Sequence, residues 1–380
     1  MDIETFSASV PGGDGALTAP QGRRAGRRAT MKEVARLAGV SLSTVSTVIN
    51  AKRQVSPELE ERVLEAARVL QYRRDLTASN LRRADRVSAS IGLVLPDVSN
   101  PFFSAVHRGI EEVARQRGVF TLAGSSDEDP TREQHLIDAF SARSADGLVI
   151  APTGADQSYL ARAREEGIPI VFVDRAPRQF EADMVLSDNS GGIAMAVAQL
   201  LAIGHRQIGY IGDLAEIPTA AERLAGYREA LGRHGVAEDP RLIRMNVHSS
   251  ASAQQIVFDM VSIPDPPTAL ISAQNLITVG TVHALRTLGL QHRIAVIGFD
   301  DLVLADATEP ALTVVAQNPL AIGHRACELL FARIDGEAGP SRRVIVPTSM
   351  IRRGSGEIGP RAGKSGQING DTAEVARHTG

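Results

Sequence analysis

The 380-residue sequence predicts a small all-α N-terminal head followed by an α/β core of two lobes, each a doubly wound parallel sheet. Three observations predict this organisation. Capping residues and apolar stripes of helical spacing occupy residues 30–74. Short apolar strands alternate with amphipathic helices from about residue 87. Basic charge is concentrated ahead of that alternation.

The head begins with two short helices. Thr30 and Glu33 have the spacing of a capping box, so the first helix is expected to begin at Met31. Gly39 suits the left-handed residue that ends it, and Ser41 suits the cap of a second helix.

The second helix is expected to run to about Ile49, with valines facing inward and small polar residues facing out. The inward set is Val40, Val45 and either Val48 or Ile49, and the outward set is Leu42, Ser43, Thr44, Ser46 and Thr47. A short Ala35 side chain lets the two helices cross closely. The two predicted helices therefore match the pattern of a helix-turn-helix, and the alternative is a small structural helical bundle.

A third helix is expected after Ser56, with Pro57 at its first position. Its predicted apolar stripe is Val63, Leu64, Ala67 and Leu70. Residues 75–86 contain one more short helical stretch, 76–83. Residues 1–29 are predicted to be a disordered basic arm, and residues 354–380 a disordered tail.

Charge separates the head from the rest of the chain. Residues 23–86 hold 15 basic and 7 acidic residues, a net charge of +8, whereas the remainder carries −11. A basic head on an acidic body favours a polyanion as partner of the head, although a solvated helical surface also carries such charge.

The core, residues 87–353, is predicted from its alternation of strands and helices, which favours parallel sheets with crossover helices. The expected strands are 91–95, 120–123, 147–151, 170–173, 208–211, 269–272 and 295–299. The expected helices include 102–117, 193–201, 220–233 and 276–288. Seven strands exceed the needs of one such sheet, so two lobes are expected.

Several classes of protein lack support in the sequence. Cys327 is the one cysteine of the sequence, which excludes an intramolecular disulfide. Because it lies in an apolar helical stretch, we expect it to be a small core residue. The nine histidines form no metal-binding pair, and no Gly-x-Ser-x-Gly motif is present. Residues 354–359 match Gly-x-Gly-x-x-Gly but follow no buried strand. We expect no enzyme, cofactor or metal, and a cytoplasmic protein without a signal peptide or membrane span.

Polar and aromatic residues gather where predicted strands end or helices begin. In parallel sheets ligands bind at the carboxyl ends of the strands. Carboxylates, amides and an arginine beside aromatic rings are suited to sugar hydroxyls or purine edges. The candidate ligand-binding residues are Asp97, Phe102, Phe103, Asp174, Arg223, His248, Gln274, Asn275 and Asp300. Three of these residues have a structural alternative: Asp300 as a turn cap, Arg223 paired with Glu222 or another carboxylate, and Phe103 as a core residue.

The head closely resembles that of the LacI/GalR family of bacterial repressors. The resemblance rests on Val34-Ala-Arg-Leu-Ala-Gly-Val-Ser41, Thr44-Val-Ser46, Val48-Ile-Asn50 and Val55-Ser-Pro57. It continues through Asp97-Val-Ser-Asn-Pro-Phe-Phe103, Gly204-His-Arg-Gln-Ile208, Arg223-Leu-Ala-Gly-Tyr227 and Val296-Ile-Gly-Phe-Asp-Asp301, and spans about residues 30–353.

The resemblance implies a homodimeric transcription regulator, most simply a repressor, on a pseudo-palindromic DNA operator. It implies a periplasmic-binding-protein-like core that holds a small effector, sugar-like or related to polyols and nucleosides, between its lobes. Expected DNA contacts are Leu42, Ser43, Thr44, Thr47, Asn50, Lys52, Arg53, Arg73 and Leu81, the last as a minor-groove wedge from the hinge helix. An ordinary linker is the alternative for that helix.

Five positions depart from the family's usual pattern. Thr47 stands where an arginine is common, and Arg74 where a proline is common near the hinge. His248 replaces an aromatic residue, and Gln274-Asn275 replaces an Asn-Asp pair. These departures leave the operator and the effector open. The alternatives to a regulator are a free-standing sugar-binding protein and a sugar- or nucleotide-modifying enzyme with a DNA-binding head.

Overall fold

The computed structural model describes residues 29–49, 55–72, 88–154 and 156–360. The chain divides into two compact units, residues 1–86 and 87–380. We call the described part of the first unit the head and that of the second the core. Residues 1–28 of the predicted arm, the hinge helix and residues 361–380 lie outside the described residues. The last residue of the predicted arm, Ala29, is instead buried in the core of the head.

The head consists of helices α1 (Met31–Ala38), α2 (Leu42–Ile49) and α3 (Pro57–Val69). The capping box of Thr30 and Glu33 is formed, and Gly39 has the left-handed φ of 64°. Val34, Val45 and Val63 are fully buried and join the three helices in one cluster. The three predicted helices are therefore confirmed, with the first starting at the predicted residue.

Two details of α3 differ from the prediction. Leu64 is 50 % exposed, and Ala66 instead fills the cluster, because the apolar stripe is narrower than expected and faces only α1 and α2. Ser56 occupies the N-cap position, but its side chain makes no capping hydrogen bond.

The first lobe of the core is a six-stranded parallel sheet in the order β11-β5-β4-β3-β1-β2. Helices α5 and α12 pack on one face and α6 and α7 on the other. Its elements are β1 (Ser90–Leu95), α5 (Pro101–Gln116), β2 (Phe120–Ser125), α6 (Pro130–Ala142), β3 (Leu148–Ile150), η1 (Ser158–Leu160), α7 (Ala161–Glu165), β4 (Ile170–Val173), β5 (Asp183–Ser187), α12 (Pro319–Ile334) and β11 (Arg343–Val346).

The second lobe repeats the plan in the order β12-β10-β9-β8-β6-β7, with β12 alone antiparallel. Helices α8 and α9 cover one face, and α10 and α11 the other. Its elements are α8 (Asn189–Ile203), β6 (Ile208–Ile211), α9 (Pro218–Arg233), η2 (Pro240–Leu242), β7 (Ile243–Arg244), α10 (Ser250–Val261), β8 (Ala269–Ser272), α11 (Asn275–Thr287), β9 (Ala295–Phe299), β10 (Thr313–Ala316), β12 (Ser349–Ile351) and η3 (Gly354–Glu357).

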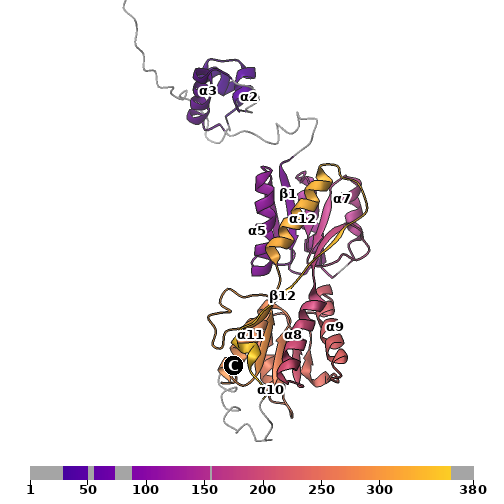
Figure 1. The fold of residues 1–380 in the computed structure, drawn as a ribbon. Helices are drawn as coiled ribbons and strands as arrows, with labels where there is room; N and C mark the ends of the chain where they lie inside the picture. The colour runs from indigo at the N-terminus through magenta and orange to yellow at the C-terminus, as the bar shows by residue number, and fades with distance from the viewer. Residues whose placement is uncertain (1–28, 50–54, 73–87, 155, 361–380) are drawn as a thin grey trace, which may run out of the picture. The chain divides into compact units, whose positions relative to one another are not determined.

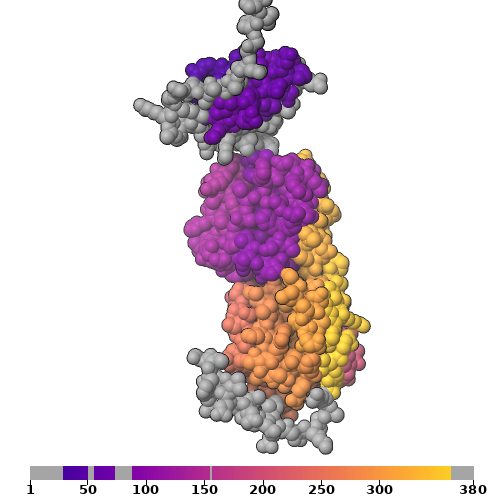
Figure 2. Space-filling model, turned by 90° about the vertical axis from the view of Figure 1, so that its left-hand side faces the viewer, coloured from indigo at the N-terminus to yellow at the C-terminus, as the bar shows by residue number. Residues whose placement is uncertain are grey.

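The chain crosses between the lobes three times: after β5, after β10 and between β11 and β12. Figure 1 shows one result, the orange helix α12 packed among the purple elements of the first lobe. Figure 2 shows orange residues along the edge of the magenta lobe. Both lobes therefore contain residues from distant parts of the sequence, and the three crossings form the hinge between them.

The predicted tail begins too early. Ser355 is buried in η3, where its hydroxyl donates to Val296 O at 2.7 Å and accepts from Thr313 N at 2.8 Å. Residues 354–360 therefore pack on the second lobe, because the small residues of this segment fit closely against β9 and β10. Cys327 is buried in α12, as predicted.

Candidate functional site

In the head, the predicted recognition helix α2 is capped as expected. The hydroxyl of Ser41 accepts from Thr44 N at 3.1 Å. Leu42 is 42 % exposed, Ser43 is exposed, and Thr44 and Thr47 are half-buried. The other predicted DNA contacts, Asn50, Lys52, Arg53, Arg73 and Leu81, lie outside the described residues.

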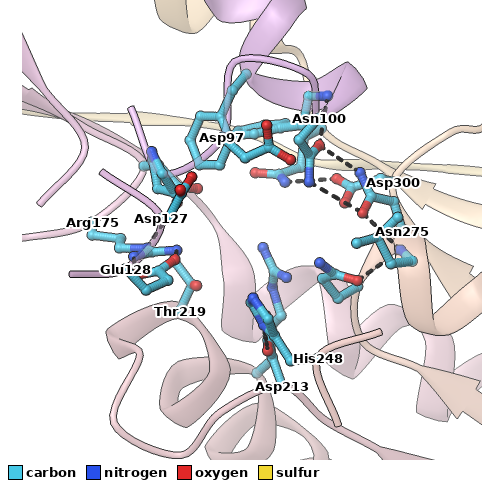
Figure 3. A pocket seen from close by; sticks show the side chains of 18 residues that line it. Asp97, Asn100, Asp127, Glu128, Arg175, Asp213, Thr219, His248, Asn275 and Asp300 are labelled. Carbon is cyan, nitrogen blue, oxygen red and sulfur yellow. Dashed lines mark hydrogen bonds and ion pairs between the residues drawn. The ribbon is translucent and has the colours of Figure 1, made fainter. Parts of the chain in front are cut away.

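In the core, the predicted ligand-binding residues surround one pocket of about 220 Å³ at the carboxyl ends of the strands of both sheets (Figure 3). All nine line it. The first lobe contributes Asp97, Phe102, Phe103 and Asp174, and the second contributes Arg223, His248, Gln274, Asn275 and Asp300. The geometry is that of a small-ligand site at the switch point of α/β sheets.

Phe102 and Phe103 open helix α5 and meet edge to face, with ring centroids 5.1 Å apart. Asn100 caps that helix by accepting from Phe102 N at 3.0 Å. Both rings are buried in the core of the first lobe and also line the pocket. The pocket and core roles of Phe103 are thus not alternatives.

Arg223 is held rigidly from α9. Its Nε donates to Asn189 Oδ1 and its Nη1 to Ala273 O, each at 2.8 Å. Its guanidinium carbon lies 3.9 Å from the ring centroid of Phe299, a cation–π contact. Glu222 is bound by Asn189 instead, so pairing of Glu222 with Arg223 is wrong.

Asp174 and Asp300 place two buried carboxyl groups at the pocket. Burial raises the pKa of Asp174 to about 6, against the lowering effect of Arg175 and Arg223. Burial also raises the pKa of Asp300, whose carboxylate accepts from Gln317 Nε2 at 2.7 Å. Removal from water disfavours a charged carboxylate, so a hydrogen-bond donor on a ligand would stabilise both groups.

The other cations of the pocket are already paired. Arg175 makes two 2.7 Å hydrogen bonds to Glu128 and lies 3.3 Å from Asp174. His248 Nδ1 lies 2.6 Å from Asp213 Oδ1, and this hydrogen bond raises the pKa of His248. Six carboxyl groups face two arginines and one histidine, so surplus acceptors dominate the lining. The pocket therefore suits a ligand rich in hydrogen-bond donors, such as hydroxyl or amine groups.

The side-chain amides of Asn100 and Asn275 join the two lobes beside the pocket. Asn275 Nδ2 donates to Asn100 Oδ1 at 2.8 Å. Gln274 caps α11 by accepting from Leu276 N at 2.7 Å, which ties its carbonyl oxygen to the helix. Asn275 therefore both lines the pocket and forms a hydrogen bond between the lobes, so a ligand that contacts it can change how the lobes are held together.

Nine residues of the lining were not predicted from the sequence. Asp213 follows β6 as Asp97 follows β1, a pattern that could have found it. Strand β2 extends two residues beyond its predicted end, which hid the lining residues after it. Strand β10 was not predicted, which hid Gln317. The missed residues are Pro96, Asn100, Asp127, Glu128, Arg175, Asp213, Thr219, Leu276 and Gln317.

Two other kinds of site are absent from the part of the chain that the structure describes. It contains no group of three or more His, Cys, Asp or Glu side chains placed to hold a metal ion. None of its helices is both long and apolar enough to span a membrane.

Comparison with known proteins matches both units. Residues 30–75 match the family of bacterial regulatory proteins of the lacI type, and residues 197–356 match a periplasmic binding protein-like domain. The transcriptional repressor CytR of Escherichia coli K12 is 30 % identical over 329 residues, which cover 86 % of this chain and 96 % of that protein.

Solved structures match as well. A complex of the transcriptional regulator CelR with cellobiose is 29 % identical, with a TM-score of 0.64, over 86 % of this chain and all of that one. The Lac repressor dimer bound to operator, 24 % identical with a TM-score of 0.77 over 87 % of this chain and 99 % of that one, shares the fold. These relatives are regulators rather than enzymes, and the chain belongs to the LacI family of bacterial transcriptional regulators.

Proposed function

We propose that this regulator is a repressor whose affinity for its operator is controlled by an uncharged, hydroxyl-rich effector bound between the core lobes. We propose a sugar, polyol or nucleoside as this effector. The observation that carries the proposal is the pocket at the carboxyl ends of both sheets, which is lined by donors and acceptors of both lobes. The relative crystallised with cellobiose supports a sugar.

We propose that ligand binding and DNA binding are coupled through the three chain crossings between the core lobes. Asp300 is bonded to Gln317, which lies directly after β10 in one of the three crossings. Asn275 is bonded to Asn100 across the rim. A ligand that competes for these amides and carboxylates favours one relative position of the lobes. Coupling between such sites is typically about 1–3 kcal/mol.

We further propose a homodimer that reads two half-sites, acting in the cytoplasm on the bacterial chromosome. Exposed apolar side chains support a protein interface on the core. Phe120 is 70 % exposed and Leu122 37 % exposed on β2, the edge strand of the first sheet. Val279 on α11 is 45 % exposed. Analytical ultracentrifugation of the wild-type chain and of Phe120→Asp tests this assignment; a wild-type monomer at micromolar concentration contradicts it.

The effector assignment is tested with the purified full chain. A thermal-shift screen of pentoses, hexoses, disaccharides, polyols and nucleosides is followed by titration of each hit into protein bound to an operator fragment selected from random DNA. At least one hit should raise the melting temperature and change operator affinity at least fivefold.

The matched variants are Arg223→Lys and Arg228→Lys, both on α9. Lysine cannot reproduce the two hydrogen bonds and the ring contact of Arg223, so ligand affinity should fall at least tenfold. Arg228 pairs with Glu238 at the surface, and its replacement should leave affinity unchanged. A hit that is insensitive to Arg223→Lys contradicts binding in this pocket.

A further inference from the structure

Several hydroxyl groups of the predicted recognition helix α2 and its N-cap form hydrogen bonds within this helix. Ser41 Oγ lies 2.7 Å from Ser43 Oγ and 2.8 Å from Thr44 Oγ1. Thr47 Oγ1 donates to Ser43 O, one turn earlier, at 2.9 Å. A threonine hydroxyl bonded to the preceding turn is a common arrangement in helices. These hydroxyls are therefore poorly placed to give a base edge a new, direct hydrogen bond.

Beside these hydroxyl groups, α2 also exposes apolar groups. Its sequence, Leu-Ser-Thr-Val-Ser-Thr-Val-Ile, contains no charged side chain. Leu42 at its first turn is 42 % exposed although it is a large aliphatic residue. The hydroxyl of Thr47 is tied to Ser43 O, which leaves its methyl group as the part of the side chain free of the helix.

In the major groove only thymine presents a methyl group, and threonine methyl and other apolar groups contact it favourably. Guanine, in contrast, is read by the paired donors of arginine or lysine, which α2 lacks. We infer that Leu42 and Thr47 are the specificity-determining residues of the head and that each reads a thymine methyl. This inference rests on the proposed operator-binding function, with α2 taken as the helix that enters the major groove.

The first experiment selects duplexes from a randomised library with the full-length protein. Selections with Leu42→Ala and with Thr47→Ser, which loses the methyl but keeps the hydroxyl, identify the base pairs that each residue reads. We expect thymine at both positions in the wild-type selection and relaxed preference in the matching variant.

The second experiment replaces each selected thymine with uracil, which differs only by the missing methyl. One methyl contact is worth roughly 0.8 kcal/mol, so each replacement should weaken wild-type binding about fourfold. Uracil placed elsewhere in the duplex is the control. Thr47→Ser should lose the distinction between thymine and uracil at one position, and Thr47→Val, which keeps the methyl without the hydroxyl, should retain it.

The outcomes separate cleanly. Selection of guanine or cytosine where Leu42→Ala and Thr47→Ser act, or equal binding to thymine and uracil there, overturns the inference while leaving the DNA-binding function intact. Loss of the thymine–uracil distinction in Thr47→Val also overturns it, because the hydroxyl would then be the reading group. A selection that enriches no sequence contradicts sequence-specific DNA binding itself.

Discussion

Asp174 and Asp300 occupy matching positions in the two lobes. Each directly follows the third strand of its sheet, β4 or β9, and each has a left-handed backbone, with φ of 67° and 74°. Asp174 N donates to Val185 O at 3.0 Å, and Asp300 N to Val315 O at 2.9 Å. Aspartate tolerates this conformation better than most residues. The pocket is thus built from one strand-end turn used twice.

The first prediction concerns the burial of these carboxylates. Because the pKa of Asp174 is about 6 in the folded chain and 3.8 normally, the folded state holds this proton more tightly than the unfolded state. The ionised carboxylate therefore costs folding free energy, about 3 kcal/mol once the pH exceeds 6, and the cost disappears below about pH 4.

Asp174→Asn removes that cost at neutral pH. The variant should be more stable than wild type toward urea at pH 7.5, by up to about 3 kcal/mol, and the difference should shrink toward pH 4. Urea denaturation at four pH values, followed by circular dichroism, measures it. A variant that is destabilised more at pH 7.5 than at pH 4 would show that the ion pair with Arg175 outweighs burial.

The second prediction concerns Asp183, a buried carboxylate with the opposite shift. Burial alone would raise its pKa, but hydrogen bonds from Arg333 and Arg342 lower it to about 2. These three side chains fasten the end of α12 and the start of β11 to the first lobe. The stabilisation is therefore complete above about pH 4 and is lost as the pH falls toward 2.

Asp183→Asn should reduce the free energy of unfolding by about 3 kcal/mol at pH 7, because it leaves two arginines without their shared anion. The loss should narrow as the pH is lowered from 4. Urea unfolding at pH 7 and 3.5 provides the comparison, with Glu229→Gln, which breaks an exposed pair with Arg233, as the control expected to change stability little. An equal loss at both pH values contradicts the electrostatic account.

The third prediction uses two glycines in helices. A Cβ on Gly323 of α12 would lie 2.2 Å from Val106 O of α5, whereas a Cβ on Gly232 of α9 would have no atom within 4 Å. Gly323→Ala must push α5 and α12 apart and should cost at least about 2 kcal/mol. Gly232→Ala should stabilise the chain by up to about 1 kcal/mol. Thermal unfolding of both variants measures these changes in stability. A Gly323→Ala variant as stable as wild type would contradict the close packing of α5 and α12.

The elements that the sequence predicts best are those with strong local signals. Strands β4, β6, β8 and β9 end where predicted, since each is rich in apolar residues and a polar residue or a turn follows closely in the sequence. Strand β11 contains a short apolar run, Val344–Val346, but it lies at the edge of its sheet, where exposed and half-buried residues alternate. It joins the first sheet because the preceding helix, α12, packs on that lobe and leads the chain to the free edge of β5.

The pocket was predictable to the same extent. Residues directly after apolar strands, such as Asp174 and Asp300, were found because the strand end is visible in the sequence. Glu128 was missed because β2 extends two residues beyond its predicted end, and Gln317 was missed because β10 was not among the predicted strands. The packing of Leu64, which is exposed, depends on which side of α3 meets α1, and helical spacing alone leaves that choice open.

The last prediction separates two serines that look alike in the sequence. Ser41 and Ser56 both stand at helix N-caps, but only Ser41 makes the capping hydrogen bond, to Thr44 N. Ser41→Ala should therefore destabilise α2 by about 1 kcal/mol and speed hydrogen exchange of its amides about fivefold. Ser56→Ala should leave exchange in α3 nearly unchanged. Hydrogen exchange of the full chain, read by mass spectrometry, compares the two helices in one experiment. If Ser56→Ala accelerates exchange in α3 as much as Ser41→Ala does in α2, the two caps are equivalent in solution and the local hydroxyl network of α2 has no special weight.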